Sequence, residues 1–481
     1  MPIQNKVKEP IDLEPLFPDH ESSEPLGAQF VRRLRTAIKS GFFPTASRLL
    51  PSRTLARRLG ISRNTVTSAL DQLVAEGYLE ARVGAGTFVT DTLHEPRKLT
   101  DAPARQLPIA ARELTSIQTR LDAVGSSFGP LRVGAPDLSA FPLRTWQRLE
   151  RKNLAVVEEY LDYYDASGLL DLRRAISGHI AQFRGVVADS DQIIVVEGTQ
   201  GALDLIAFVL TKCGSEVAIE DPCYQLARAI FEGHGLLLHG VAVDRAGMRT
   251  NELPREASLA YVTPSHQFPL GGAMPLARRK EILEWAQLAD AYIVEDDYDS
   301  EFDAHPLPAL QSLDRDDRVI YVGTLSKTLA PGLRAAYIVA PRHLAPTLRF
   351  ARAVTSLGGS PHLQKTIADF IAGGYFSRHV RHMTAIYERR RRIVVDTFAK
   401  GLPPGFSVGP AQTGLHVAIS GPLDFDDVRA ANTMPPGNRV LPISLLCLER
   451  TDCKGLLVGF SAGSDEAVAH AAAMLAGSLH S

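Results

Sequence analysis

The sequence has few cysteines and no long apolar run. Its four cysteines form no C-x-x-C pair and are too few to cross-link 481 residues, so they favour a reducing compartment and give no support to zinc fingers. No stretch of about 18 apolar residues is present to cross a bilayer, and the first residues lack the apolar core of a signal peptide. We therefore expect a cytoplasmic protein without a membrane partner.

The sequence also has little net charge, and this balance conceals a basic segment. Lys and Arg number 52 against 54 Asp and Glu, which gives a formal charge of −2. Residues 26–90 nevertheless hold ten Lys or Arg and only three acids, a local charge of +7, so the rest of the chain carries −9. Such a local positive field attracts polyanions that the average charge does not predict.

The length predicts several folded units, because 481 residues exceed one typical domain. Residues 1–25, rich in Pro and acids, indicate a mobile leader, and residues 91–125 a linker with a short helix near its end. Between them, residues 26–90 form a compact basic unit. Residues 126–481 alternate short apolar strands with amphipathic helices, which predicts an α/β domain with a mostly parallel sheet. The expected strands include 192–197, 216–220, 291–295, 319–323 and 335–339.

The basic unit has the pattern of three helices followed by a hairpin. An apolar residue recurs every four positions from Phe30 to Ile38, as in a helix with one buried stripe. Residues 52–59 indicate a second helix, capped by Ser52. Ser62 is placed to cap a third helix that ends at Gly77, and the next residues read as a small hairpin.

Three helices and a hairpin, with a glycine turn before the third helix, predict a winged helix-turn-helix whose third helix enters a DNA major groove. Arg63, Asn64 and Thr67 on that helix can contact base edges, and Thr65 with the helix amides can hold a phosphate. Glycines in the wing allow a close approach to the sugar-phosphate backbone. The expected DNA-contacting residues are Arg53, Ser62, Arg63, Asn64, Thr65, Thr67, Gly84, Gly86 and Thr87.

Charge alone does not decide between a DNA reader, a protein-interaction module and a solvated arginine-rich face. The pattern is more specific than the charge. The segment reads LPSRTLARRLGISRNTVTSALDQLVAEGYLEARVGAGTFV and resembles the DNA-binding domain of GntR-type bacterial regulators across nearly its whole length. The resemblance implies double-stranded operator DNA as the partner.

The larger unit places polar residues at the ends of its expected strands. The segment TLSK (324–327) follows one strand, with Arg334 seven positions beyond its lysine. Asp296 and Tyr298 follow another strand, at the place where α/β proteins build ligand sites. The segment GTQG (198–201) ends a third strand and opens a helix, whose N-terminal amides can bind phosphate.

Together these residues match the needs of pyridoxal 5′-phosphate (PLP), which requires a Schiff-base lysine, a carboxylate at its ring nitrogen, a partner for its ring hydroxyl and a phosphate cradle. We expect Lys327 to form the Schiff base, Asp296 to keep the ring nitrogen protonated and Tyr298 to bond the ring hydroxyl. Tyr224 is expected to stack on the ring, and Gln267 to share the hydroxyl. The full expected set is Thr199, Gln200, Tyr224, Gln267, Asp296, Tyr298, Thr324, Ser326, Lys327 and Arg334.

Each fragment alone has an ordinary interpretation, as a surface lysine, a solvated acidic loop or metal site, or a helix cap. Their order is specific. The chain contains YYDASGLLDLRRAISGHI, QIIVVEGTQGALDL, EDPCY, TPSHQFPLGG, EDDYDSEF and GTLSKTLAPGLR, which resemble fold-type I aminotransferases and, over about residues 26–465, the MocR/GabR family of regulators. The resemblance implies a large domain, a small C-terminal α+β domain, and a head-to-tail homodimer in which each winged helix lies against the partner's large domain.

Two arginines implied by the resemblance are missing. Amino-acid aminotransferases of this fold clamp the substrate carboxylate with an arginine near the C-terminus, where this chain has Leu457, and Leu226 stands where the GABA-responsive member has another arginine. A carboxylate buried against leucine without a cation would cost several kcal/mol. The effector is then held by other cations, is a non-carboxylate amine, or is PLP itself. The candidate cations are Lys454, Arg352 and Arg228.

Three functions remain open at this point. The leading hypothesis is a PLP-dependent DNA-binding transcriptional regulator; the alternatives are an active aminotransferase with an appended winged helix, and a binding module that has lost PLP. Retention of Lys327 and Asp296 argues against the last. No metal site is predicted, because His379 and His382 lie among arginines that repel a cation and are expected on a solvent-facing helix surface.

Overall fold

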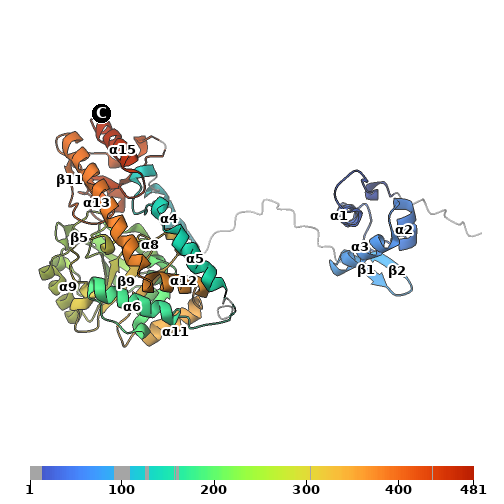
Figure 1. The fold of residues 1–481 in the computed structure, drawn as a ribbon, viewed down its shortest axis with the longest axis horizontal. Coiled ribbons are helices and arrows are strands. Elements are labelled where there is room, and N and C mark those ends of the chain that lie inside the picture. The colour runs from blue at the N-terminus through green and yellow to red at the C-terminus, as the bar shows by residue number, and fades with distance from the viewer. Residues whose placement is uncertain are drawn as a thin grey trace, which may run out of the picture. The chain divides into compact units, whose positions relative to one another are not determined.

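The chain folds into two compact units, Met1–Gln106 and Leu107–Ser481, which are drawn in Figure 1. We refer to the described part of the first unit, residues 13–90, as the head, and to that of the second as the body. The computed structural model describes residues 13–90, 109–124, 129–155, 158, 162–303, 305–435 and 437–480. Each unit has its own hydrophobic core.

The head contains the three helices and the hairpin that its sequence predicts. The apolar stripe of α1 is fully buried, as are the inward residues of α3, and the two strands pair antiparallel with Leu79 opposite Val89. Ser62 caps α3 as expected, but the prediction for Ser52 is wrong: Pro51 holds the N-cap position and Ser52 is the first helical residue. The elements are α1 (Leu26–Lys39), α2 (Ser52–Leu59), α3 (Arg63–Ala75), β1 (Leu79–Arg82) and β2 (Gly86–Val89).

The residues just before α1 differ from the expected mobile leader. Leu13 caps a short 3-10 turn and Leu16 is its last residue; they are 5% and 1% exposed and belong to the head core. The Gln29 side chain ties this segment to α1, since it donates to the carbonyls of Asp19 and Glu24 at 2.9 and 2.8 Å. Acids and prolines surround these leucines in the sequence, so no periodic apolar pattern predicts their burial. The first twelve residues of the expected leader lie outside the described residues.

The body is built on an eight-stranded sheet with the order β3-β10-β9-β8-β7-β4-β5-β6. The central strands β5, β4, β7, β8 and β9 run parallel, while β10 is antiparallel to both of its neighbours. All five strands expected from the sequence are present. The strands are β3 (Ile193–Val196), β4 (Glu216–Asp221), β5 (Leu237–Asp244), β6 (Gly247–Met248), β7 (Leu259–Val262), β8 (Tyr292–Asp297), β9 (Val319–Thr324) and β10 (Ala336–Val339).

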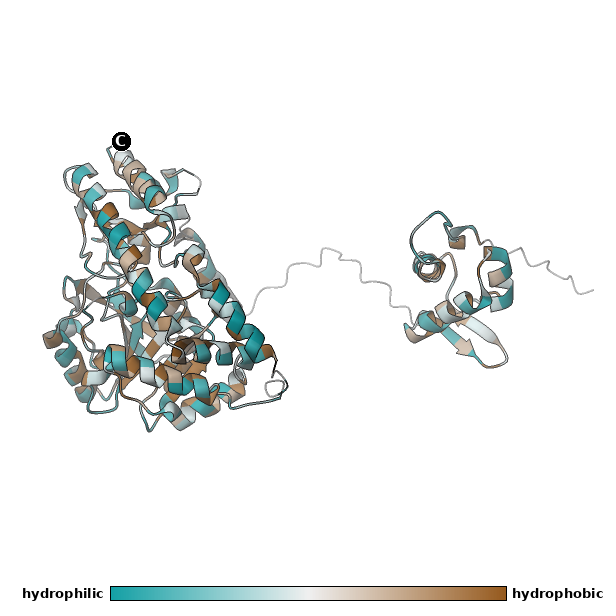
Figure 2. Ribbon diagram, in the orientation of Figure 1, coloured by the Kyte–Doolittle hydropathy of each residue, from teal (hydrophilic) through white to brown (hydrophobic). Residues whose placement is uncertain are grey.

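Helices cover both faces of this sheet, because its strands are apolar on both sides. Ile193 and Val195 point into one core cluster, and Ile194 and Val196 into another. Hydrophilic and hydrophobic residues alternate along the covering helices, as Figure 2 shows for α13. These helices are α5 (Leu143–Leu154), α6 (Leu170–Arg184), α7 (Thr199–Leu210), α8 (Gln225–Gly233), α9 (Leu276–Leu288), α10 (Leu310–Leu313), α11 (Ala345–Thr355), α12 (Pro361–Ala372) and α13 (Tyr375–Gly401).

A four-stranded antiparallel sheet with the order β11-β12-β14-β13 forms the small C-terminal part, as the resemblance implies. Its strands are β11 (Ser407–Val408), β12 (His416–Ser420), β13 (Leu441–Pro442) and β14 (Gly455–Gly459). The helices α14 (Asp427–Thr433) and α15 (Asp465–Ser478) belong to the same part, and α15 packs along α13.

The end of the predicted linker is part of the body. Helix α4 (Ile109–Val124) packs on α8, and Arg120 forms an ion pair with Glu232. This helix agrees with the expected short helix and is held on the body by its contacts with α8 and by this ion pair. Residues 91–108 of the linker lie outside the described ranges. No helix in the described part of the chain is long and apolar enough to cross a membrane.

Candidate functional site

The body contains a cavity of about 260 Å³ beyond the C-terminal ends of β8 and β9. Nine of the ten residues predicted to bind PLP line it; Gln267 does not. Parallel strands place their C-terminal ends at one edge of a sheet, which brings these motifs together although they are far apart in sequence. The lining residues are Val133, Gly134, Thr199, Gln200, Tyr224, Tyr261, Thr263, Phe268, Asp296, Tyr298, Thr324, Ser326, Lys327, Pro331, Arg334, His416 and Leu441.

Lys327 lies three residues beyond β9 with its amine inside the protein. Its Nζ donates to the Gly134 carbonyl oxygen at 2.8 Å. Burial lowers the pKa of Lys327, against the opposing effect of Asp299 and Asp296. A lowered pKa increases the neutral fraction of the amine, and the neutral amine is the form that acts as a nucleophile. A Cβ on Gly134 would lie 2.8 Å from Nζ, so the glycine leaves room for the amine.

Asp296, at the end of β8, presents one oxygen without a partner. Its Oδ2 accepts a hydrogen bond of 2.7 Å from the Tyr261 hydroxyl, while Oδ1 is buried and unpaired within the described structure. Burial raises the pKa of Asp296 to about 7. A buried polar atom without a partner is costly, so this oxygen is suited to a donor on a bound molecule. The protonated ring nitrogen of PLP is such a donor.

The opposite end of the cavity is suited to a phosphate. Thr199 and Gln200 form the first turn of α7, where backbone amides point outward and the helix dipole is positive. Arg334 Nη2 donates to the Glu197 carbonyl at 2.6 Å, and a Cβ on Gly198 would lie 2.7 Å from the same nitrogen. Arg334 has a φ of 48°, a strained backbone conformation for a non-glycine residue that tends to occur at functional sites. The donors at this end fit the cofactor's phosphate group.

Tyr224 supplies an aromatic ring beside the cavity. Its hydroxyl accepts a hydrogen bond from Gln200 Nε2 at 2.7 Å, and its ring packs edge-on against Phe268, with centroids 5.8 Å apart. Burial raises the pKa of Tyr224 to about 12, which keeps the hydroxyl protonated. The ring position is compatible with stacking on a bound pyridine.

Gln267 has a different place from the one expected. Its Nε2 donates to Glu220, to the Pro222 carbonyl and to the Phe268 carbonyl, and its Oε1 accepts from the amide of Leu270. The side chain is 1% exposed and fully used inside the loop. It therefore braces the segment before Tyr224 instead of facing the cavity, because side-chain direction in an irregular loop is set by contacts that sequence spacing does not reveal.

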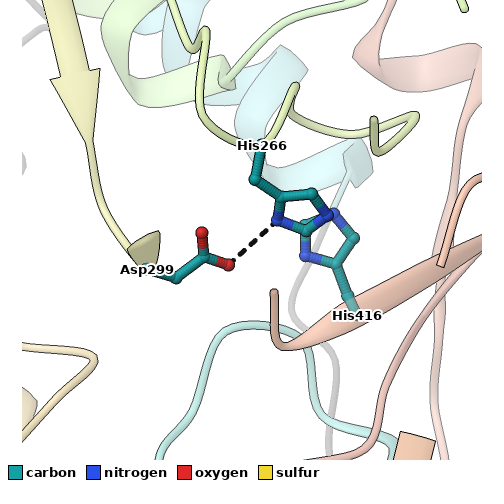
Figure 3. A group of neighbouring side chains, drawn as sticks. All are labelled: His266, Asp299 and His416. Atoms are coloured by element: carbon teal, nitrogen blue, oxygen red, sulfur yellow. Dashed lines mark hydrogen bonds and ion pairs between the residues drawn. The ribbon is translucent and has the colours of Figure 1, made fainter. Parts of the chain in front are cut away.

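Next to Tyr298 lies a buried group that the sequence analysis did not single out. It consists of His266, Asp299 and His416 (Figure 3). His266 Nδ1 lies 3.0 Å from Asp299 Oδ2, and the Tyr298 hydroxyl donates to the His266 carbonyl at 2.9 Å. The two imidazoles are tilted against each other, with centroids 4.5 Å apart and an interplanar angle of 31°. His266 thus supports Tyr298 through its carbonyl, and the Nε2 atoms of His266 and His416 are buried without a hydrogen-bond partner among the described residues.

The prediction for His379 is wrong in its burial. This side chain is 8% exposed, and burial lowers its pKa while it bonds the backbone of Thr328. Helix α13 turns His379 toward the core, whereas His382, three residues on, is exposed. Although the two histidines are three residues apart on one helix, His379 is therefore buried and His382 faces solvent.

None of the cations proposed for the effector lines the cofactor cavity. Arg352 forms an ion pair with Glu197, and Arg228 donates to Glu232 and to the Cys447 carbonyl. Lys454 lines a separate cavity of about 800 Å³. Leu457 is fully buried in a cluster of the small sheet. None of the three candidate cations therefore faces the cofactor cavity of this chain.

In the head, the start of α3 presents the predicted DNA-contacting residues. Ser62 Oγ accepts from the Thr65 amide at 3.0 Å and shares a 2.8 Å hydrogen bond with its hydroxyl. The side chains of Arg63 and Asn64 are exposed and make no hydrogen bond within the described head. Thr67 donates to the Arg63 carbonyl at 3.0 Å, which leaves its oxygen lone pairs as acceptors.

The remaining predicted contacts lie on α2 and the wing. Arg53 is exposed and, among the described residues, has no partner. Gly84 has a φ of 75° and open space where a Cβ would stand. The exposed Arg48 was missed: a Cβ on Gly86 would lie 2.9 Å from its Nε, so its guanidinium covers the wing beside Thr87. Only the folded hairpin brings Arg48, which precedes α2, to the wing.

Each of the two units is similar to proteins of a known family. Residues 26–89 match the family described as bacterial regulatory proteins, gntR family, and residues 131–429 match aminotransferase class I and II. Among solved structures, an archaeal alanine:glyoxylate aminotransferase is similar with a TM-score of 0.70 and 25% identity, covering 77% of this chain and 97% of that one. The Pyrococcus horikoshii kynurenine aminotransferase gives a TM-score of 0.67 at 24% identity, covering 80% and 97%.

Relatives with both units cover nearly the whole chain. The probable rhizopine catabolism regulatory protein MocR of Rhizobium meliloti is 35% identical over 458 residues, which is 92% of this chain and 91% of that protein. The HTH-type pyridoxine biosynthesis transcriptional regulator PdxR of Corynebacterium glutamicum is 31% identical over 85% of each chain. The chain therefore belongs to the MocR-type family of GntR regulators and is a DNA-binding transcriptional regulator with an aminotransferase class I and II domain.

Proposed function

We propose that the regulator holds PLP on Lys327 and that occupancy of this pocket, by PLP and by an amine effector, controls how its head reads an operator. The observation that carries the proposal is the unpaired, buried Oδ1 of Asp296, in a cavity that also contains a buried lysine amine and a helix N-terminus. When bound, PLP supplies an aldehyde that condenses with primary amines and an electron-withdrawing ring.

Each wall of the cavity has a role in this proposal. Lys327 attaches the cofactor through its amine, and Asp296 accepts the ring N–H. Tyr298 bonds the ring hydroxyl, held in place by its own bond to His266. Tyr224 stacks on the ring. The phosphate is held by the start of α7 and the hydroxyls and guanidinium near it, namely Thr199, Gln200, Thr324, Ser326 and Arg334.

The cofactor is tested with Lys327→Ala. We expect wild-type protein that has been supplied with PLP and then desalted to keep a visible absorption band, and the variant to lose it, because the covalent link is gone. Lys212→Ala, which removes an exposed lysine of the body, is the matched control and should keep the band. A wild-type protein that folds but shows no band would contradict the proposal.

For DNA, we propose that α3 enters the major groove and that Arg63 contacts base edges or phosphate at its start. Arg63→Ala should weaken operator binding in a gel shift by about tenfold or more, since one good side-chain contact contributes about 1–3 kcal/mol. The visible band should be unaffected. Arg315→Ala, which removes an exposed arginine of the body, is the control. Equal binding by the Arg63 variant and the control would refute this placement of α3.

We further propose that the protein works in the cytoplasm as a head-to-tail homodimer, as its family resemblance implies, on a palindromic or direct-repeat operator. Two heads on two half-sites add their binding free energies, while one head alone binds weakly. The alternative is an active aminotransferase. Leu457, in place of the carboxylate-binding arginine, removes the cation with which amino-acid aminotransferases of this fold orient a substrate for turnover. Multiple-turnover keto-acid formation from an amino acid would support the alternative, and sedimentation of the PLP-loaded protein tests the dimer.

A further inference from the structure

We propose that Arg132 replaces the missing arginine clamp and binds the carboxylate of an effector whose amine lies at Lys327. The effector is then an amino acid whose amine reaches the cofactor cavity at Lys327 and whose carboxylate lies in a neighbouring cavity beside Arg132. This inference rests on the proposed function of the pocket and names the residue that selects its effector.

The first observation is the position of Arg132 beside a second cavity. A cavity of about 620 Å³ adjoins the cofactor cavity, and both are lined by Val133, Gly134, Lys327 and Pro331. Arg132 lines only the second cavity. The lysine amine, bonded to the Gly134 carbonyl two residues from Arg132, therefore stands at the boundary between the two spaces.

The second observation is that Arg132 has a free charge. Its side chain is exposed, and among the described residues it forms no ion pair or hydrogen bond. The other arginine of this cavity is matched, because Arg390 bonds Asp137 at 2.8 Å and Asp465 at 3.0 Å. The positive charge of Arg132 is close enough to contribute to the lowered pKa of Lys327. An anion entering this cavity thus meets one uncompensated guanidinium, which suits a planar carboxylate.

The third observation is that the backbone holding Arg132 is fixed. Its amide donates to the Gly129 carbonyl at 3.1 Å, and a Cβ on Gly459 would lie 2.0 Å from the Arg132 carbonyl oxygen. Strand β14 therefore packs directly on the Arg132 segment at Gly459, which is two residues after the buried Leu457. Leu457 supplies no cation, but Arg132 lies on a neighbouring segment whose backbone packs against the same strand. Arg132 can therefore supply the positive charge that Leu457 lacks.

The test compares amines with and without a carboxylate. PLP-loaded, full-length wild-type protein and the variants Arg132→Gln, Arg132→Lys and Arg144→Gln are titrated with β-alanine, γ-aminobutyrate, propylamine and butylamine. Two readouts are followed, the change in visible absorption and the shift in unfolding temperature. Arg144, exposed on α5 and without a partner among the described residues, lines neither cavity and is the control.

We expect wild-type protein to respond to at least one amino acid at a lower concentration than to the matching alkylamine. Arg132→Gln should raise the half-saturating concentration of that amino acid about tenfold or more, leave the alkylamines unchanged, and keep the visible band; Arg132→Lys should fall between. Equal effects on both classes of amine, no effect, or no response of wild-type protein to either amino acid would overturn the inference. Loss of the wild-type band would instead refute the proposed PLP site.

Discussion

At the scale of single residues, burial raises the pKa of two acids in the body, one of which lines the cofactor cavity. Burial raises the pKa values of both Asp296 and Glu220 to about 7. Glu220 Oε2 accepts from Thr263 and Gln267, while Glu220 Oε1 and Asp296 Oδ1 are both buried without a partner in the described structure. Of the two acids, Asp296 lines the cavity and Glu220 does not. A group that is unfavourable without a ligand and paired with one is a typical trade of stability for function.

The sign of this effect predicts a pH dependence. The unfolded-state pKa of Asp is about 3.9, so between about pH 4 and pH 7 the folded protein holds a proton on Asp296 that the unfolded chain has lost. Its contribution to stability is therefore present below about pH 4 and lost as the pH rises through about 7. Without PLP, Asp296→Asn should lose less stability than wild type between about pH 5 and pH 8, because it does not titrate.

Urea unfolding of the cofactor-free protein at the two pH values measures this difference. Asp296→Asn should also bind PLP more weakly, since an amide cannot stabilise a protonated ring nitrogen. Asp424→Asn, at an exposed acid, is the control and should follow wild type in both respects. A variant with the same pH dependence as wild type would show that Asp296 does not have the raised pKa on which the argument depends.

At the scale of elements, short caps and turns position the residues that touch ligands. Ser62 fixes the first turn of α3 by accepting from the Thr65 amide, and this turn carries Arg63 and Asn64. In the body, the turn from Gly198 into α7 does the same for the expected phosphate site. In both places a helix N-terminus faces the proposed anion. The local sequence that begins the helix therefore also provides the amide donors and the positive end of the helix dipole.

Removing the α3 cap should loosen this turn. We expect Ser62→Ala to destabilise the head by about 1 kcal/mol and to weaken operator binding, while Ser62→Asp keeps the cap. Faster hydrogen exchange of the α3 amides in the full-length protein, followed by mass spectrometry, measures the first effect. Ser68→Ala changes an exposed serine in the same helix away from its end and should not speed exchange. Unchanged exchange in Ser62→Ala would mean that the cap contributes nothing.

At the scale of the whole molecule, the chain has two units with separate hydrophobic cores. The expected cofactor residues all belong to the body, and the expected DNA contacts all belong to the head. A regulator of this kind needs an effector with different affinity for two arrangements of its parts, since only differential binding shifts an equilibrium.

Calorimetry of the full-length protein should therefore resolve two unfolding transitions. Saturating PLP is expected to raise the transition of the body, because ligand at a hundred times its dissociation constant adds about 2.7 kcal/mol, and to leave the head transition nearly unchanged. Lys327→Ala should reduce the shift. A shift of equal size in both transitions would contradict the assignment of the cofactor to the body alone.

The sequence by itself determined the fold class, the regular elements and the motifs at the strand ends, because periodicity and cap residues act over a few neighbouring positions. Nine of ten expected pocket residues line one cavity because the parallel strands that carry these motifs end at one edge of the sheet, and their roles toward PLP remain a proposal. Only the tertiary structure decided the direction of Gln267 and the burial of Leu13 and His379. It also decided that Arg132 and Lys327 line one cavity. These depend on contacts between segments distant in the chain, which local pattern does not encode.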